Sequence, residues 1–137
     1  MNPNPAQTVA RLVGIVLVAF GVLGFVPGVT VHSSDLSFAG HGSGAMLVGQ
    51  FQVSTLLNLV EIVLGAAGVA LANGPGGARS YLAGGGVAFL ALWALGMANG
   101  AAWIPLNVAD RWLDLGLGVS LIALAFATRE PMPVAGA

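Results

Sequence analysis

The chain has 137 residues, of which 57% are hydrophobic and only 7% are charged, and its formal net charge at pH 7 is -1. A soluble domain carries roughly 25% charged residues, so this composition excludes a cytosolic globular protein, and it also excludes a disordered chain. The four arginines and the lack of lysine exclude a basic surface for nucleic acid. Together with a mean hydropathy of +0.92, these values indicate a single-domain integral membrane protein.

Four apolar segments are each long enough to cross a membrane as an α-helix. Each has about 19–23 residues, and at a rise of about 1.5 Å per residue that length covers a hydrocarbon core of roughly 30 Å. The chain lacks the alternating pattern of a membrane barrel, so we predict an all-α fold, an integral membrane four-helix bundle with antiparallel up-down topology. The segments cover about residues 8–26, 50–72, 80–99 and 106–128.

Turn and capping signals mark the ends of these segments. Residues 1–6 contain two prolines and are predicted to be irregular, and Pro27 ends the first helix. The sequence Asn-Gly-Pro-Gly-Gly at residues 73–77 predicts a tight turn between the second and third helices. Asn107 is predicted to be the N-cap of the fourth helix.

The connection over residues 28–49 is longer than most loops in compact proteins. It is rich in Gly and Ser, and two interpretations fit it: a solvated linker, or a lid that faces a partner. It holds three potential metal ligands, His32, Asp35 and His41, but their spacing matches no known zinc motif. We therefore expect solvated loop residues here, with no bound metal or other cofactor.

The arginines predict the orientation of the chain in a membrane. With four spans, both termini and the turn near residue 76 share one side, and Arg11, Arg79 and Arg129 lie there. Arg111 is the single arginine on the other side. Because positive charge is enriched in cytoplasmic loops, we predict cytoplasmic termini and an outward-facing loop.

Small residues recur every three or four positions along the predicted helices, which places them on one face of each helix. Such faces let helix backbones approach closely, and this is what holds helices together in lipid. Packing within the bundle is the favoured interpretation, and contacts between copies of the chain are the alternative. The glycines predicted to pack helices are Gly14, Gly21, Gly24, Gly28, Gly65, Gly68, Gly96, Gly100 and Gly118.

Glu61 is the most informative polar residue, because it lies near the middle of the second segment. A charge at that depth costs roughly 2.5–3.5 kcal/mol on insertion scales, so we expect Glu61 to face the bundle interior as a neutral acid. Asn58, three residues earlier, is predicted to donate a hydrogen bond to it. Ser54 continues the same polar face.

Asp114 is the second acid within a predicted span, and it lies about two turns into the fourth segment. Helix geometry places Glu61 deeper than Asp114 by very roughly 5–10 Å, so we expect no direct contact, although water could link them. Three roles are open for the pair: structural bonds between helices, a proton or ion path, or contact with a partner. Carboxylates alone make a poor transition-metal site.

Over about residues 9–127 the chain resembles the DUF4383 family of small four-span bacterial membrane proteins, which is frequent in actinobacteria, and four stretches carry the resemblance. They read GVLGFVPGVT, FQVSTLLNLVEIVLGAAGVALA, ARSYLAGGGVAFLALWALG and ADRWLDLGLGVSLIALAF. The family's second helix typically reads H-N-L-V-H-L-L-x-G, and here its two histidine positions hold Leu57 and Glu61. A histidine common in the family's fourth helix falls at Asp114. The resemblance implies the fold and a bacterial inner-membrane location, but no activity.

The sequence offers no catalytic constellation, so we expect a protein that is not an enzyme. The leading hypothesis is an accessory or structural subunit of a larger bacterial membrane complex, in contact with membrane lipid and with a membrane-protein partner or a second copy of itself. The alternative is a small proton- or solute-conducting module that uses the intramembrane carboxylates Glu61 and Asp114.

Overall fold

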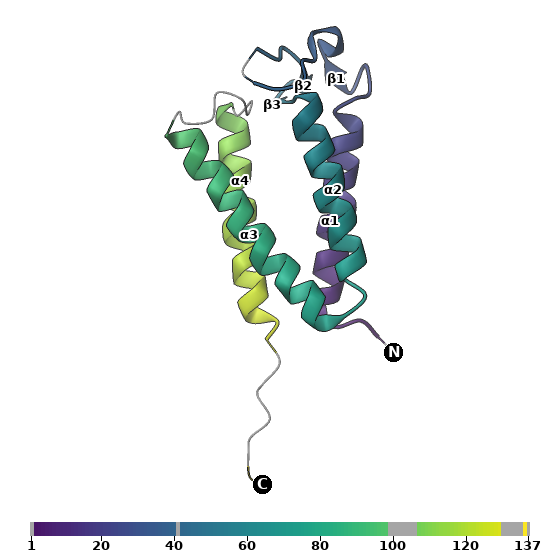
Figure 1. The fold of residues 1–137 in the computed structure, drawn as a ribbon, viewed down its shortest axis with the longest axis vertical. Helices are drawn as coiled ribbons and strands as arrows, with labels where there is room; N and C mark the ends of the chain where they lie inside the picture. Colours follow the sequence, from purple (N-terminus) through teal and green to yellow (C-terminus); the bar gives the residue numbers. More distant parts are fainter. Residues whose placement is uncertain (1, 41, 99–106, 130–135, 137) are drawn as a thin grey trace.

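The computed structural model describes residues 2–40, 42–98, 107–129 and 136. Most of these residues are helical, and four α-helices run alternately up and down (Figure 1). This confirms the predicted helical character of the chain. The helices are α1 (Pro5–Leu23), α2 (Thr55–Leu71), α3 (Pro75–Met97) and α4 (Val108–Ala127).

The helices are arranged as two pairs. α1 packs along α2 and α3 packs along α4, whereas the contacts between the pairs are fewer and are made mainly by α3 against α1 and α2. Figure 1 shows why: α3 starts beside α1 and α2 and slants away from them toward α4. The beginning of α1 and the end of α4 lie at the same end of the molecule.

Glycines bring the backbones together within each pair. A Cβ atom placed on Gly14 of α1 would lie 2.5 Å from the carbonyl oxygen of Gly65 on α2, and the reverse distance is also 2.5 Å. In the second pair, a Cβ on Gly86 of α3 would lie 3.0 Å from the carbonyl oxygen of Gly118 on α4. Real Cβ atoms essentially never come as close as 2.5 Å, and 3.0 Å is tighter than most of their contacts, so glycine favours both close approaches.

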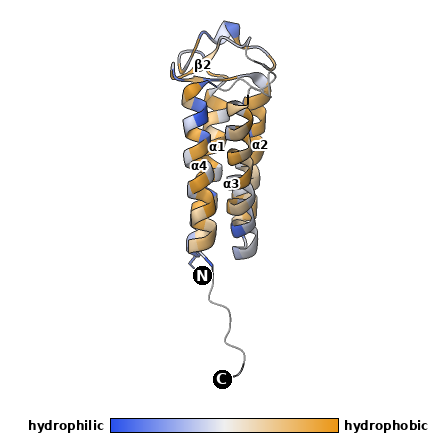
Figure 2. Ribbon diagram, turned by 90° about the vertical axis from the view of Figure 1, so that its left-hand side faces the viewer, coloured by the Kyte–Doolittle hydropathy of each residue, from blue (hydrophilic) through white to orange (hydrophobic). Residues whose placement is uncertain are grey.

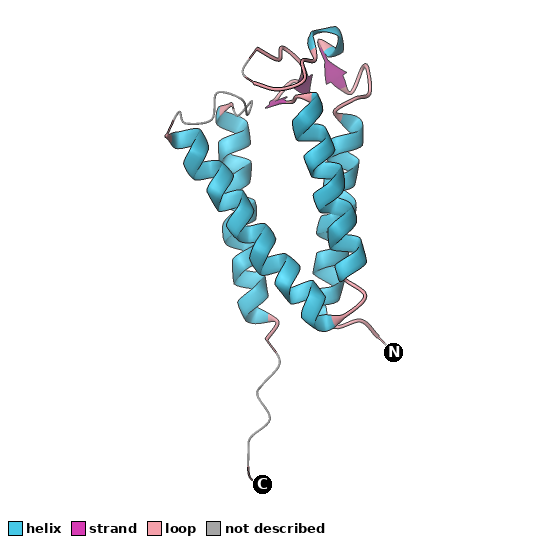
Figure 3. Ribbon diagram, in the orientation of Figure 1, coloured by secondary structure: helices cyan, strands magenta, loops and turns pink. Residues whose placement is uncertain are grey.

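A small antiparallel sheet covers one end of the molecule (Figure 3). We call residues 27–40 and 42–53 the β-cap. Its strands pair in the order β1-β2-β3, and β2 and β3 are joined by a turn in which Val48 and Gly49 adopt positive φ. The strands are β1 (Thr30–Val31), β2 (Met46–Leu47) and β3 (Phe51–Gln52), with a 3-10 turn at Ser33–Asp35.

The prediction of an all-α fold is therefore wrong within the connection over residues 28–49, where a small sheet forms. Ala45, Leu47 and Val53 are almost fully buried and form a hydrophobic cluster of their own, against which Phe20 of α1 packs. The strands have only two residues each, which is too short for an alternating pattern to appear in the sequence. The long connection folds because its few large apolar residues meet over the end of α1.

Three helix boundaries also differ from the prediction. Helix α1 already begins at Pro5, because Asn4 and Gln7 form a capping box. Helix α3 begins at Pro75, within the predicted turn, because proline is well suited to the first position of a helix. Helix α2 begins only at Thr55, because the preceding residues belong to the sheet. The predicted N-cap at Asn107 is confirmed.

Two of the four helices, α1 and α3, are long and apolar enough to cross a membrane, judged by length and composition within the described residues. Helix α2 is apolar but has 17 residues, and α4 carries charged residues in its first two turns. Figure 2 shows the helices as predominantly hydrophobic along their length. These features are consistent with a membrane protein.

Candidate functional site: a cavity between the helix pairs

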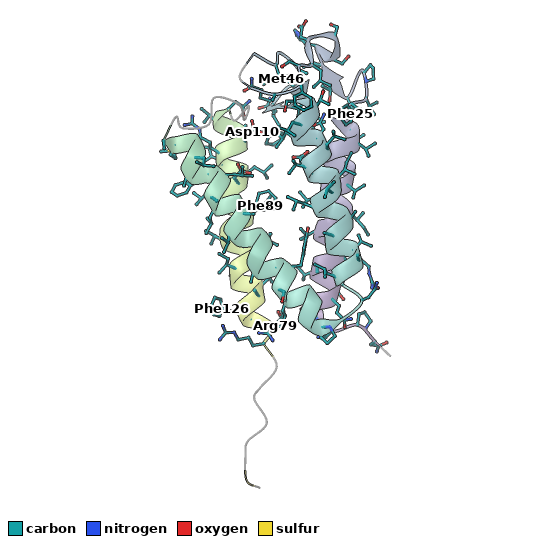
Figure 4. All side chains as sticks on the ribbon, in the orientation of Figure 1. Phe25, Met46, Arg79, Phe89, Asp110 and Phe126 are labelled. Atoms are coloured by element: carbon teal, nitrogen blue, oxygen red, sulfur yellow. The ribbon has the colours of Figure 1, made fainter. Side chains whose placement is uncertain are left out.

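A cavity of about 310 Å³ lies between the two helix pairs. All four helices contribute to its wall, and every lining residue is aliphatic or phenylalanine except for three acids. The acids are Glu61 from α2 and Asp110 and Asp114 from α4. The apolar lining residues are Leu12, Val13, Val16, Leu17, Phe20, Leu57, Val60, Leu64, Phe89, Leu92, Leu113 and Leu117. Figure 4 labels Phe89 and Asp110 on the side of α3 and α4 that faces the other pair.

Helix α3 closes the cavity toward the beginning of α1. There the ring of Tyr81 packs against Gly68 of α2, where a Cβ atom would lie 2.5 Å from the ring. The side chain of Gln7 donates a hydrogen bond of 3.0 Å to the carbonyl oxygen of Ala72, which joins the start of α1 to the end of α2. Leu82 of α3 is fully buried in the same cluster.

The β-cap closes the opposite end through hydrogen bonds to α4. The backbone N–H of Gln52 donates to Oδ2 of Asp110 at 3.2 Å, and Nδ2 of Asn107 donates to the carbonyl oxygen of Gln50 at 2.7 Å. Asn107 also caps α4, with its Oδ1 accepting from the N–H of Asp110 at 2.9 Å. These bonds hold the start of α4 against the β-cap.

The cavity opens toward the outside of the helices. Three lining residues, Leu12, Val16 and Val60, have 57%, 52% and 40% of their surface exposed. The opening is thus bordered by aliphatic side chains from α1 and α2.

The three acids have different partners. Asp110 is 7% exposed and accepts hydrogen bonds from the backbone N–H groups of Asn107 and Gln52. Asp114 is 6% exposed, and its Oδ2 is buried without a hydrogen-bond partner among the described residues. The same is true of Oε2 of Glu61. Both aspartates are close enough to Glu61 to act on it electrostatically. The cavity therefore presents two acceptor oxygens that the described part of the chain leaves unused.

None of the basic residues that the structure describes lines the cavity. Arg111, the arginine nearest in sequence to the two aspartates, donates from Nη1 to the sulfur of Met97 at 3.9 Å. It lines a separate hollow between α3 and α4, together with Trp93 and Trp112. Among the described residues, the cavity wall therefore holds three carboxyl groups and no basic side chain to pair with them.

The predicted hydrogen bond from Asn58 to Glu61 is not formed. Asn58 is fully buried, and its side chain faces Gly24 of α1 rather than the cavity. Neither its Nδ2 nor its Oδ1 has a partner within the described ranges. Residues three apart on a helix differ by about 60° in direction, which here separates the α1 contact from the cavity. Ser54 has a local role: its Oγ accepts from the N–H of Leu57 and caps α2.

Most of the predicted packing glycines lie at helix contacts, but not all. A Cβ atom on Gly21 would contact the backbone of Asn58. Gly28 lies beyond α1 with a φ of +94°, and a Cβ atom there would have nothing within 4 Å, so this glycine shapes a turn and packs no helix. Gly96 is half-buried in α3, and Gly100 falls outside the described residues.

The structure describes two of the three predicted loop candidates. His32 has a positive φ and precedes the 3-10 turn, Asp35 is exposed at the end of that turn, and His41 lies outside the described residues. Within the part of the chain that the structure describes, no group of three His, Asp or Glu side chains could hold a metal ion.

Sequence reasoning missed Asp110 as a wall residue of the cavity and Gly86 as a contact residue. Asp110 precedes Asp114 by four positions, and that spacing alone places both on one helix face. Gly86 belongs to the run Gly84-Gly85-Gly86, in which the sequence does not show which glycine meets the neighbouring helix.

The comparison with known families gives one match. A family model described as a domain of unknown function, DUF4383, matches residues 7–127, so the chain belongs to this family. No curated protein and no solved structure matches the chain.

Proposed function

We propose that this member of the DUF4383 family is a multi-pass protein of a bacterial cytoplasmic membrane that conducts protons or a small solute. In this proposal the cargo passes through the cavity between the helix pairs, and Glu61 and Asp114 bind it. The observation that carries the proposal is a pair of buried carboxyl oxygens on the wall of one cavity, neither of which has a hydrogen-bond partner among the described residues. A carboxyl group that serves only to join helices would be hydrogen-bonded to a neighbouring helix.

The outer faces of the helices support a membrane location. Large aliphatic residues are widely exposed on each helix, among them Leu12 on α1, Val63 on α2, Val87 on α3 and Val119 on α4. A water-soluble bundle would place charged side chains at such positions, whereas lipid favours aliphatic ones. The three acids instead face the space between the pairs.

The distribution of arginine supports cytoplasmic termini. Arg79 lies at the end where α1 begins, near Phe126 of α4 (Figure 4). Arg129 lies beside the same residue, with its guanidinium carbon 4.1 Å from the centre of the Phe126 ring. Arg111 lies toward the β-cap, near the start of α4. By the positive-inside tendency, the end with Arg79 and Arg129 is cytoplasmic and the β-cap faces outward.

A conduction path through this molecule requires both closed ends of the cavity to open. At the β-cap end, the contact to be broken is the hydrogen bond between Gln52 and Asp110. At the other end, α3 must move relative to α1 and α2 where Tyr81 meets Gly68. We propose that the helix pairs move as units about these two contacts, because packing is close within each pair and sparse between them.

Flux in liposomes tests this proposal. Purified protein is reconstituted, and proton uptake driven by a potassium gradient with valinomycin is followed with an internal pH dye. We expect the flux to fall at least tenfold in Glu61→Gln and Asp114→Asn. The control Asp35→Asn, which removes an exposed acid of the β-cap, should behave as the unmodified chain does. Equal flux in all four proteins, or flux no higher than that of empty liposomes, contradicts the proposal.

A second candidate function is supported by the surface of the β-cap. Phe38 and Val48 are 66% and 59% exposed. Such a surface suits contact with a membrane-protein partner or a second copy, as an accessory subunit without catalysis of its own would need. We expect native extracts to contain the protein in a larger particle, and Phe38→Ser with Val48→Ser to release it. A lone monomer in mild detergent counts against this role.

A further inference from the structure

We propose that the cavity binds a small organic cation, an apolar molecule with a protonated amine whose N–H groups donate to Glu61 and Asp114. The inference rests on the proposed function, because it names the class of cargo that the same cavity takes. It follows from the acceptors in the wall, the charge of the wall, its apolar remainder and the direction of its opening.

Two carboxyl oxygens of the cavity wall are available as hydrogen-bond acceptors. Oδ2 of Asp114 and Oε2 of Glu61 are buried and have no partner among the described residues. Asp114 as a whole is 6% exposed and lies on the cavity wall, so its free oxygen is not served by bulk water. Buried polar atoms are almost always hydrogen-bonded in native proteins, so this arrangement calls for a donor from outside the chain.

The acidic and basic residues of the wall indicate which kind of hydrogen-bond donor fits the cavity. In the part of the chain that the structure describes, three acids line the cavity and no basic residue does. Asp110 already accepts two backbone N–H groups, which leaves Glu61 and Asp114 without a compensating donor. A neutral donor such as an alcohol supplies one hydrogen, whereas an ammonium group supplies up to three and also the opposite charge. The wall therefore fits an ammonium group better than a hydroxyl group.

The rest of the wall excludes a bare metal ion as the best occupant. Calcium takes six to eight oxygen ligands, and magnesium keeps a nearly octahedral set. Apart from the acids, this cavity offers only aliphatic side chains and the rings of Phe20 and Phe89. Its volume of about 310 Å³ lies at the lower end of the range of about 300–1,000 Å³ for small-molecule sites. An apolar body of modest size fills this space, and a lone ion does not.

The residues that border the opening favour the same class of ligand, an apolar molecule with a protonated amine. It is bordered by the exposed aliphatic residues Leu12, Val16 and Val60, not by polar side chains. In the membrane location proposed above, a ligand reaches the acids from the lipid phase. An amine with an apolar body partitions into that phase and presents its charged group to the carboxyls once inside.

Binding by the full chain in lipid nanodiscs tests the inference. Phenethylamine is titrated into the sample by calorimetry, with phenethyl alcohol as a neutral probe of nearly the same shape and with empty nanodiscs as the blank. We expect the amine to bind at least tenfold more tightly than the alcohol. Glu61→Gln and Asp114→Asn should each weaken amine binding at least tenfold, and Asp35→Asn should leave it unchanged.

Several outcomes overturn the inference: equal affinity for amine and alcohol, amine binding that survives both acid substitutions, or displacement of the amine by an equimolar amount of sodium or potassium. If either variant fails to fold, the comparison of amine with alcohol on the unmodified chain still decides. Carboxyl-dependent proton flux without amine binding removes this inference and leaves the proposed function. Amine binding without any flux removes the proposed function and leaves the cavity as a binding site for an organic cation.

Discussion

The contact within each helix pair and the space between the pairs are built from different residues. Where α1 meets α2, glycine faces glycine, and the backbones of Gly14 and Gly65 touch. Where the pairs face one another, leucine, valine, phenylalanine and three acids line an open cavity. Both regions belong to the same four helices, so helix geometry does not account for the difference.

The comparison shows what small and large residues do in an apolar bundle. In lipid, helices gain little from hiding leucine from the solvent, because the solvent is as apolar as leucine. Close backbone approach is what holds them, and glycine permits it within the pairs. Between the pairs the side chains are large and some are acidic, so approach is prevented and the space persists. The effects of substitutions in the two regions should therefore differ both in the property that changes and in the size of the change.

The largest effect is expected from adding a methyl group inside a helix pair. In Gly65→Ala the new Cβ would lie 2.5 Å from the carbonyl oxygen of Gly14 and 2.6 Å from the amide nitrogen of Val18. Backbone atoms cannot turn away, so we expect a loss of about 3 kcal/mol in the free energy of unfolding. Reversible unfolding in mixed micelles measures it.

The matched control is Gly116→Ala on α4, where a Cβ would have nothing within 4 Å. This exchange should leave the protein equally stable or more stable by up to about 1 kcal/mol, because alanine favours a helix over glycine. Equal effects of the two alanines would mean that the pairs are not held by close backbone contact.

A smaller effect is expected where α4 meets the β-cap. Asn107→Ala removes the N-cap of α4 and the 2.7 Å bond to the carbonyl oxygen of Gln50. We expect a loss of about 1–2 kcal/mol in unfolding free energy, together with altered flux, because this bond holds one closed end of the cavity. Ser54→Ala removes the N-cap of α2 but no bond to α4. It should cost a similar stability and leave the flux as it was, and a change of flux in both variants would contradict this role of Asn107.

A still smaller effect on stability is expected from filling the cavity. Leu64→Phe adds bulk to the wall on α2, and we expect the unfolding free energy to change by no more than about 1 kcal/mol, because the site has room. Flux and amine binding should be lost. Leu82→Phe provides the contrast, because Leu82 is fully buried away from the cavity. This variant should lose about 1–3 kcal/mol in the free energy of unfolding. If Leu64→Phe lost more stability than Leu82→Phe, the cavity would be shown to be closed in the membrane.

The smallest effect is expected at Asn58, the buried amide of the α1–α2 contact. Its side chain finds no hydrogen bond among the described residues, so replacing it with leucine, a residue of similar shape, removes an unpaired polar group. We expect Asn58→Leu to change the unfolding free energy by less than about 1 kcal/mol, in the stabilising direction. A loss of several kcal/mol in a thermal or detergent unfolding experiment would show that the amide has a partner in the membrane.

The sequence was sufficient for the features that depend on length and local chemistry. Four long apolar segments predicted four helices, and the position of Asn107 before the last segment predicted its N-cap. The spacing of Glu61 with small residues predicted that it turns inward, and it does line the cavity. Each of these follows from a pattern within one segment.

The features that depend on how segments meet were not predictable. The sheet consists of two-residue strands brought together by the cluster around Leu47 and Val53, so no single stretch of sequence reveals it. The prediction that the Asn58 side chain points toward Glu61 was wrong, because the packing of α1 against α2 decides which face of α2 contacts α1 and which faces the cavity. The role of Asp110 was missed, because its hydrogen bond to the β-cap depends on a residue that comes almost sixty positions earlier.

The central claim is that an open, cation-accepting cavity separates the two helix pairs in the membrane, and cysteine labelling tests it most directly. The chain has no cysteine of its own, so Leu117→Cys in liposomes places a single thiol on the cavity wall. A cationic methanethiosulfonate should modify it faster than an anionic one of similar size, and Glu61→Gln with Asp114→Asn should abolish that preference. Leu82→Cys, buried away from the cavity, should stay unmodified. No labelling at position 117, or equal rates with both reagents, would contradict the account.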